Sequence, residues 1–138
     1  MRTTTVSGDH RVFGRSVQGR PLIAWYRGPT HAVRRILVIG AVHGNEAAGV
    51  ALVRNLLRQP APTRSELIAV PDLNPDGVAL GVRQNAHRVD LNRNFPYEWH
   101  RTGRPGDQTD PVPGPLPEPG GRTLGSRVGT GAAPPPAA

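Results

Sequence analysis

The stretch that decides the fold runs from Ile36 to Gln59 and reads ILVIGAVHGNEAAGVALVRNLLRQ. Its first seven residues, 36–42, are a continuous apolar run rich in β-branched side chains, which predicts a strand buried on both faces. From Glu46 to Gln59 the apolar residues recur with a helical period, and two prolines then end the predicted helix. The run Leu-Ile-Ala-Val at 67–70 predicts a second buried strand. Strand, helix and strand at this spacing predict a βαβ unit and an α/β fold.

The segments on either side of this unit carry turn signals. Residues 12–26 alternate apolar and polar side chains around Gln18-Gly19-Arg20, which predicts a β-hairpin with a glycine-containing turn. Asn74-Pro75-Asp76-Gly77 predicts a turn after the second strand, because asparagine starts it, proline fixes φ and glycine ends it. From Gly77 to Trp99 the periodicity fades. Irregular polar segments beyond strand ends are where α/β proteins place their sites.

The apolar content is concentrated in the front of the chain. Residues 103–138 are rich in glycine and proline and contain no aromatic side chain. Such a composition cannot bury enough apolar surface to offset the entropy of ordering. We therefore expect one domain in residues 1–102 and a disordered Pro/Gly/Ala-rich tail in 103–138.

Charge and composition argue against several classes of function. The formal net charge is +7, but the basic residues are scattered and form no basic run, which argues against nucleic-acid binding. No apolar run approaches the roughly 20 residues of a membrane span. The chain has no cysteine, so thiolate metal sites and disulfides are excluded. We expect a cytoplasmic protein that binds neither nucleic acid nor membrane, and the sequence leaves its oligomeric state open.

His43 and Glu46 are the first candidate site residues. They are spaced i, i+3 where the predicted strand gives way to the helix, and a shared first helical turn would place both side chains on one face. Imidazole nitrogens and carboxylate oxygens are zinc ligands. Gly44 would let the backbone turn sharply between them. By itself the pair is a weak signal, and the alternative is a helix-capping segment in which Glu46 favours the N-terminal end of the dipole.

A second polar cluster comprises Arg83-Gln84-Asn85 and the run 90–95, Asp-Leu-Asn-Arg-Asn-Phe. An arginine fork matches a carboxylate with two parallel hydrogen bonds, and asparagine adds a neutral donor. Arg83 could instead face an oxyanion that develops during hydrolysis. The alternative is a solvated loop in which Asp90 pairs with Arg88 or Arg93. From the residues alone, these possibilities stay open.

Taken in order, His43-Gly44-Asn45-Glu46, Asn74-Pro75-Asp76-Gly77, Arg83 and the run 90–96 resemble the zinc carboxypeptidase family, the carboxypeptidase A-like metallopeptidases. The bacterial murein peptide amidase branch is the most similar, and its opening hairpin resembles residues 13–22. The match spans roughly residues 12–99. It implies a mixed-sheet, three-layer fold. N-acyl amino acid deacylases of the aspartoacylase and succinylglutamate desuccinylase kind share the His-Gly-Asn-Glu motif. The later motifs favour the peptidase.

The resemblance also implies roles at a metal centre. His43 and Glu46 would be two of three ligands to Zn2+. Asp90 would lie behind His43 as an acceptor that fixes the imidazole tautomer. The implied chemistry is zinc-assisted hydrolysis, in which the metal activates a bound water and polarises the scissile carbonyl.

Three further residues would act on the substrate. By the same resemblance Arg83 would be the catalytic and substrate-binding group that stabilises the oxyanion of the tetrahedral intermediate. Asn92 and Arg93 would hold the terminal carboxylate of the substrate. The implied substrate is a peptide with a free terminal carboxylate, cleaved at an amide bond.

The sequence departs from the family pattern at two points. Arg88 stands where the family usually has glycine, which would strain or reshape the loop. The third zinc ligand of the family is a later His and its general base a later Glu, yet no His follows His100 and the only Glu after Glu98 is Glu118. We expect a truncated or frame-shifted chain with an incomplete fold and an exposed apolar sheet edge. Weak zinc affinity with little or no turnover, or a catalytically dead peptide-binding remnant, would follow.

Overall fold

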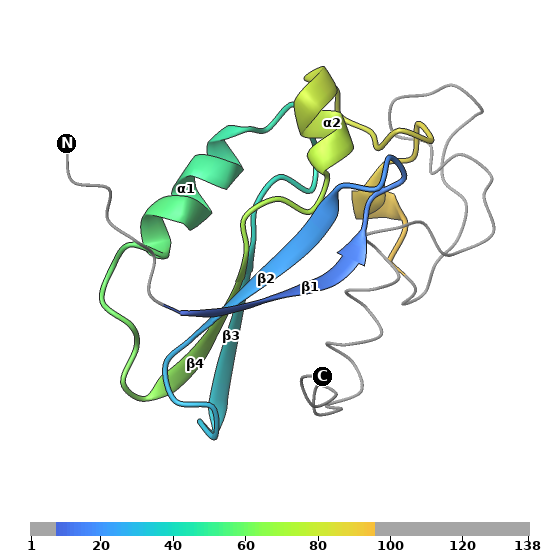
Figure 1. Cartoon of the computed structure of the whole chain (residues 1–138). Coiled ribbons are helices and arrows are strands. Elements are labelled where there is room, and N and C mark those ends of the chain that lie inside the picture. Colours follow the sequence, from blue (N-terminus) through green and yellow to red (C-terminus); the bar gives the residue numbers. More distant parts are fainter. Residues whose placement is uncertain (1–7, 96–138) are drawn as a thin grey trace.

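A computed structural model describes residues 8–95. The elements are β1 (Asp9–Arg15), β2 (Pro21–Arg27), β3 (Arg34–Ile39), α1 (Ala48–Leu56), β4 (Ser65–Val70), α2 (Pro75–Leu80) and the 3₁₀ turn η1 (Leu91–Arg93), as Figure 1 shows. The expected tail at 103–138 and the last part of the expected domain lie outside the described residues.

The four strands form one mixed sheet in the order β1-β2-β4-β3. Strands β1 and β2 make the predicted antiparallel hairpin, with an irregularity between Val12 and Gly14. Strands β3 and β4 pair in parallel, and helix α1 connects them along the chain. This arrangement confirms the predicted βαβ unit. Strand β2 joins the hairpin to this unit by antiparallel pairing with β4. The predicted α/β class and mixed sheet are therefore correct.

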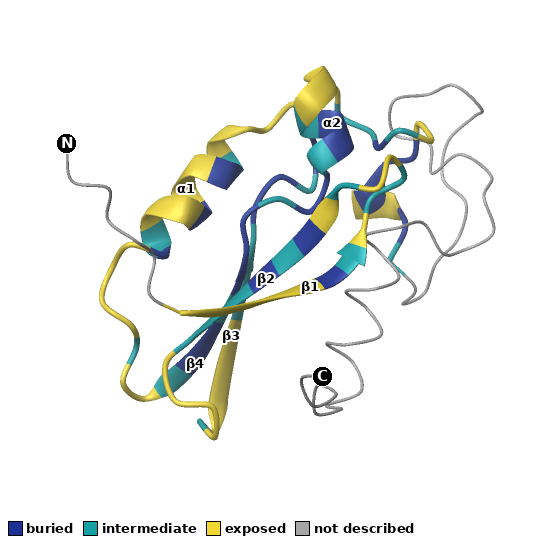
Figure 2. Cartoon of the chain, viewed as in Figure 1, coloured by how far each residue is buried: buried dark blue, intermediate teal, exposed yellow. Residues whose placement is uncertain are grey.

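Within residues 8–95, strand β3 forms one edge of the sheet and is only partly covered, which makes the prediction that it is buried on both faces wrong. Its first three residues are exposed and the rest are half-buried (Figure 2). Strand β4, which lies between β2 and β3, has the burial that was expected of β3. A continuous apolar run indicates what a strand can bury. It does not say whether neighbouring elements cover the strand. Ile36 in β3, for example, is 47% exposed.

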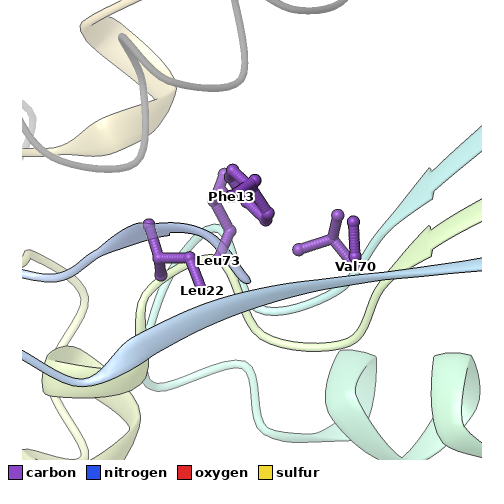
Figure 3. Close-up of a cluster of buried hydrophobic side chains, with 5 residues drawn as sticks. Phe13, Leu22, Val70 and Leu73 are labelled. Carbon is purple, nitrogen blue, oxygen red and sulfur yellow. The ribbon is translucent and has the colours of Figure 1, made fainter. Parts of the chain in front are cut away.

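Side chains alternate between the two faces of the sheet, and each face has its own core. On one face, helix α1 packs its buried residues against β4; the cluster is Val53, Leu57, Leu67 and Ala69. The cluster on the other face is Phe13, Leu22, Ala24, Val70 and Leu73; Figure 3 shows this cluster and labels all of these residues except Ala24. Strands β2 and β4 contribute side chains to both clusters. They therefore fix the position of the loops that follow β3 and β4.

Helix α1 is shorter at both ends than the predicted helix from Glu46 to Gln59. Ala47, at its N-cap, has no side-chain acceptor for the free N–H groups of the first turn. At the other end, the guanidinium of Arg27 donates to the carbonyl of Leu57 and, at 2.7 Å, to that of Gln59. Neither helix between residues 8 and 95 has the length and apolarity needed to cross a membrane.

Asn74-Pro75-Asp76-Gly77 begins helix α2 and is not the isolated turn that was predicted. Asn74 is the N-cap, and its side-chain oxygen accepts from the Gly77 N–H at 3.0 Å. Pro75 takes the first helical position and Gly81, at φ 66°, ends the helix. The prediction failed because turns and helix N-caps favour the same residues. The described part of that segment, residues 77–95, is thus less irregular than expected.

Candidate active site

His43 lies between two carboxylates in the loop that joins β3 to α1. Its Nδ1 is 2.9 Å from Oε1 of Glu46, and its Nε2 is 3.1 Å from Oδ1 of Asp90. The imidazole and Asp90 are buried, whereas the Glu46 side chain is 61% exposed. The structure thus joins three of the predicted site residues, and it places one carboxylate inside the protein and one toward solvent.

His43 and Glu46 do not share a helical turn, because α1 begins only at Ala48. The Glu46 N–H instead donates to the His43 carbonyl at 3.1 Å. This single i+3 hydrogen bond closes a tight turn that brings the two side chains together. The prediction that the side chains meet is correct, and its helical explanation is wrong.

Gly44 is required by a close backbone approach and not by a sharp turn. A Cβ at this position would lie 2.0 Å from the carbonyl carbon of Gly77 in α2. The Gly44 N–H also donates to the carbonyl of Arg83 at 3.2 Å, and the Asn74 side chain donates to the same oxygen. The His43 loop is therefore packed directly against α2 and tied to the segment that carries Arg83.

Asp90 is fully buried and is the hub of the site, by which we mean that its carboxylate contacts His43, Arg83 and the Asn92 backbone. Its Oδ1 contacts His43 and also accepts from the backbone N–H of Asn92 at 2.9 Å. Its Oδ2 accepts from Nε of Arg83 at 2.9 Å. A buried charge needs such partners. The alternative in which Asp90 pairs with Arg88 or Arg93 is not realised.

The contacts of Asp90 determine what His43 can bind. An ionised carboxylate only accepts, so the neutral tautomer that satisfies Asp90 carries its proton on Nε2 and presents the Nδ1 lone pair toward Glu46. A lone pair and a carboxylate oxygen 2.9 Å apart repel unless a proton or metal cation lies between them. The His43 nitrogen and the Glu46 oxygen, with the Asp90 carboxylate behind the imidazole, fit two of the ligand positions of a zinc site.

Two donors do not make a complete metal site. Within residues 8–95, no three His, Cys, Asp or Glu side chains are grouped so that they could hold a metal ion. A metal at His43 and Glu46 would therefore need a further ligand from outside this range. The imidazole and the carboxylate fit the ion, and the remaining coordination positions are not supplied by the described residues.

In the loop at residues 85–89, Arg88 stands where the resemblance led us to expect glycine. Arg88 has φ 65°, in the left-handed region, so the expected strain in this loop is confirmed. The side-chain oxygen of Asn85 accepts from the N–H groups of His87 and Val89, each at 2.9 Å. Asn85 is buried and folds the loop, whereas the sequence suggested a donor for a substrate carboxylate.

Asn92 and Arg93 are exposed in η1, directly after Asp90. The Arg93 guanidinium donates to the backbone carbonyl of Asn92 at 3.3 Å. Among the described residues, neither side chain is joined to His43 or Glu46 by a hydrogen bond or ion pair. The structure places both at the surface near the buried hub and leaves their side chains accessible.

Asp76 is an important buried residue that the sequence did not reveal. It accepts from Ser16 Oγ at 2.8 Å, from the Gln18 N–H at 3.1 Å and from the Arg20 guanidinium at 2.5 Å. Burial alone would raise the pKa of Asp76, but the hydrogen bonds from Ser16, Gln18 and Arg20 outweigh it and hold the pKa below its ordinary value. Asp76 thus clamps the hairpin turn to α2. Its place in a local turn motif hid this long-range role.

Comparisons with known proteins identify the family of the chain. The profile of the succinylglutamate desuccinylase/aspartoacylase catalytic domain matches residues 32–112. Murein peptide amidase A of Escherichia coli K12 is 36% identical over 119 residues, which cover 77% of this chain and 49% of that protein. The chain therefore spans about half the length of this curated relative.

Solved structures give the same result. The crystal structure of murein-tripeptide amidase from Escherichia coli O157 matches with a TM-score of 0.67 and 30% identity, over 89% of this chain and 56% of that one. Carboxypeptidase A from Helicoverpa armigera matches with a TM-score of 0.75 over 88% of this chain and 37% of that one; at 18% identity, it supports the fold alone. The chain belongs to the superfamily that unites the zinc carboxypeptidases with the succinylglutamate desuccinylase and aspartoacylase catalytic domains.

Proposed function

We propose that this chain carries part of the zinc site of an amide hydrolase that acts on peptides with a free terminal carboxylate. The superfamily consists of hydrolases, and its carboxypeptidases are zinc metallopeptidases. The observation that carries the proposal is the position of His43, whose Nε2 meets buried Asp90 while Nδ1 faces Glu46. A purely structural histidine has no need of two carboxylates on opposite nitrogens.

In this proposal His43 and Glu46 hold Zn2+, and Asp90 holds His43. Asp90 keeps the proton on Nε2, orients the ring and makes Nδ1 a better donor. When bound, the zinc ion supplies Lewis-acid activation of a water and of the scissile carbonyl. The exposure of Glu46 leaves this side of the site open to solvent and substrate.

Arg83 is proposed to stabilise negative charge on the reacting carbonyl. Its Nε is held by Asp90, which fixes the plane of the guanidinium, and its side chain is 26% exposed. The terminal nitrogens are thus oriented before any substrate arrives, which is the condition for effective electrostatic stabilisation. Asn92 and Arg93, both exposed beside this hub, are proposed to bind the terminal carboxylate.

The activity of this chain itself is proposed to be low. Catalytic zinc sites use three protein ligands and a water. Residues 8–95 offer two, and the sequence beyond His100 contains no further histidine. The expected result is weak zinc binding and negligible turnover, with carboxylate-ended peptides still bound at Arg83, Asn92 and Arg93.

A second candidate function is the deacylation of N-acyl amino acids. The family profile that matches residues 32–112 favours it, because that profile describes desuccinylase and aspartoacylase catalytic domains. Both candidates would use the same ligands and the same oxyanion donor. They differ in the substrate, which is a peptide in one case and an acylated single amino acid in the other.

The test uses the purified full chain with a panel of carboxylate-ended peptides and N-acyl amino acids, each with zinc and with a chelator. The proposal predicts peptide binding that weakens at least about tenfold in Arg93→Gln, a loss of order 1.4 kcal/mol. Arg34→Gln, an exposed arginine on β3, is the matched control. Binding of N-acyl amino acids without peptide binding would favour the second candidate. Peptide binding that is unchanged in Arg93→Gln would overturn the assignment.

A further inference from the structure

A cavity on the α1 side of the sheet shares no residue with the His43 site. It has a volume of about 350 Å³ and lies between β2, α1 and the connection from β4 to α2. Its lining includes the apolar side chains of Ile23, Trp25 and Leu57 and the charged side chains of Arg54, Arg58 and Asp72. The cavity therefore combines an apolar wall with groups of both signs.

The apolar wall is packed against neighbouring side chains. Trp25 packs against the cluster that contains Leu57 and Val53, and its ring lies 4.7 Å from that of His10 on β1. Because strand side chains alternate, Ile23 and Trp25 point to the same face of β2. A flat ring fixed in this way is a surface on which an apolar or aromatic group can pack.

Two arginines stand on the helix side of the cavity. Arg54 and Arg58 are four residues apart, one in α1 and one just after it, so they lie on the same side. Both are exposed, and neither side chain makes a hydrogen bond or ion pair with another residue in the described part of the chain. Two guanidinium groups at the mouth of an apolar cavity provide the fork geometry that binds a carboxylate.

Asp72 provides the opposite charge. Its Oδ1 accepts from the Asn74 N–H at 3.1 Å, and no cationic side chain between residues 8 and 95 lies within ion-pair distance of it. Burial raises the pKa of Asp72, and neither the Asn74 hydrogen bond nor the charge of Arg54 offsets this effect. A half-buried carboxylate in this state would be stabilised by a ligand cation.

We propose that the cavity binds a free α-amino acid with an apolar side chain. The carboxylate pairs with Arg54 and Arg58, the ammonium pairs with Asp72, and the side chain packs on Trp25 and Ile23. The site would be separate from hydrolysis, and this inference does not rest on the proposed function. The two charged ends of the ligand match the two kinds of charge at the cavity.

The test is a titration of the full chain with L-phenylalanine, 3-phenylpropionate and phenethylamine, followed by NMR shifts or calorimetry. We expect L-phenylalanine to bind about tenfold or more tightly than either analogue, because each analogue lacks one charge-assisted pair. Glycine should bind at least about tenfold more weakly as well, because it lacks the apolar group.

Variants test which side chains bind the ammonium group of the ligand and which bind its carboxylate. Asp72→Asn should weaken L-phenylalanine to the level of 3-phenylpropionate and leave 3-phenylpropionate unchanged. Arg54→Gln combined with Arg58→Gln should weaken both carboxylates and spare phenethylamine. Arg34→Gln and His43→Ala should change none of these affinities, and thermal unfolding reports whether each variant is folded. Equal affinities for L-phenylalanine and its two analogues, or no saturable binding, would overturn the proposal.

Discussion

The Nε2 atom of His43 lies 3.1 Å from Oδ1 of Asp90, although the two residues are 47 positions apart in the chain. This contact joins the loop after β3 to the loop before η1. Because Asp90 also binds Arg83 and the Asn92 backbone, one buried carboxylate organises the whole candidate site. The packing of the His43, Arg83 and Asn92 segments and the chemistry of the site therefore depend on the same side chain.

Asp90→Asn should destabilise the fold by about 3 kcal/mol, because it leaves the Arg83 guanidinium without its buried charge partner. The amide nitrogen of Asn would also face a donor, either Arg83 Nε or His43 Nε2. Chemical denaturation measures the change. Asp9→Asn is the control: among the described residues Asp9 pairs only with exposed Arg11, so this variant should lose less than about 1 kcal/mol. Equal losses in the two variants would contradict the role of Asp90 as a hub.

Gly44→Ala should cost about 3 kcal/mol or more, because the new methyl would lie 2.0 Å from the Gly77 backbone and neither segment can move freely. Gly19→Ala provides the comparison. Gly19 has φ 80° with no neighbour near its Cβ position, so only the local conformational strain of about 1 kcal/mol applies. Denaturant midpoints of the two variants separate steric clash from backbone strain, and a smaller loss at Gly44 than at Gly19 would refute the close-contact explanation.

Arg88→Gly should stabilise the protein by about 0.5–1 kcal/mol. Glycine removes the strain of a left-handed side-chain-bearing residue, and its greater entropy in the unfolded chain cancels part of the gain. Arg88→Ala keeps the strain and should bring no increase. Thermal unfolding of the three proteins tests this, and a stabilised Ala variant would show that the arginine side chain, not its φ, is the cause.

The Asp76 clamp predicts a pH-dependent stability. The folded-state pKa of Asp76 lies below its ordinary value of 3.8. Its contribution is therefore present above pH 3.8 and is lost as the pH falls through the folded-state pKa. Asp76→Asn should cost about 2 kcal/mol at neutral pH. Unfolding curves should show that the gap between the two proteins closes as the pH falls below 3.8, and a gap that is constant with pH would contradict the clamp.

The sequence predicts those parts of the fold that local periodicity determines. The alternation in residues 12–26 and the apolar runs around α1 were sufficient for the hairpin and the βαβ unit. The position of β3 at the sheet edge could not be predicted, because burial depends on neighbours that a strand's own residues do not specify. The start of α2 was missed because Asn74 suits a turn and a helix cap equally well.

The site was predictable only through the order of its motifs. Spacing brought His43 and Glu46 together, but no local signal links His43 to Asp90. Family resemblance supplied that pairing, as well as the expectation that a glycine belongs at position 88. The clamp of Asp76 on Ser16 and Arg20 has no signal in a single sequence, because polar residues in turns are usually solvated.

Calorimetric titration of zinc into the purified full chain tests the central claim most directly. We predict weak binding of one ion that falls by at least about tenfold in His43→Ala and in Glu46→Gln, and by about tenfold in Asp90→Asn. His31→Ala, at an exposed histidine, should leave the affinity unchanged. Zinc binding that is the same in His43→Ala and in Glu46→Gln as in the unaltered chain would show that His43 and Glu46 do not hold the metal.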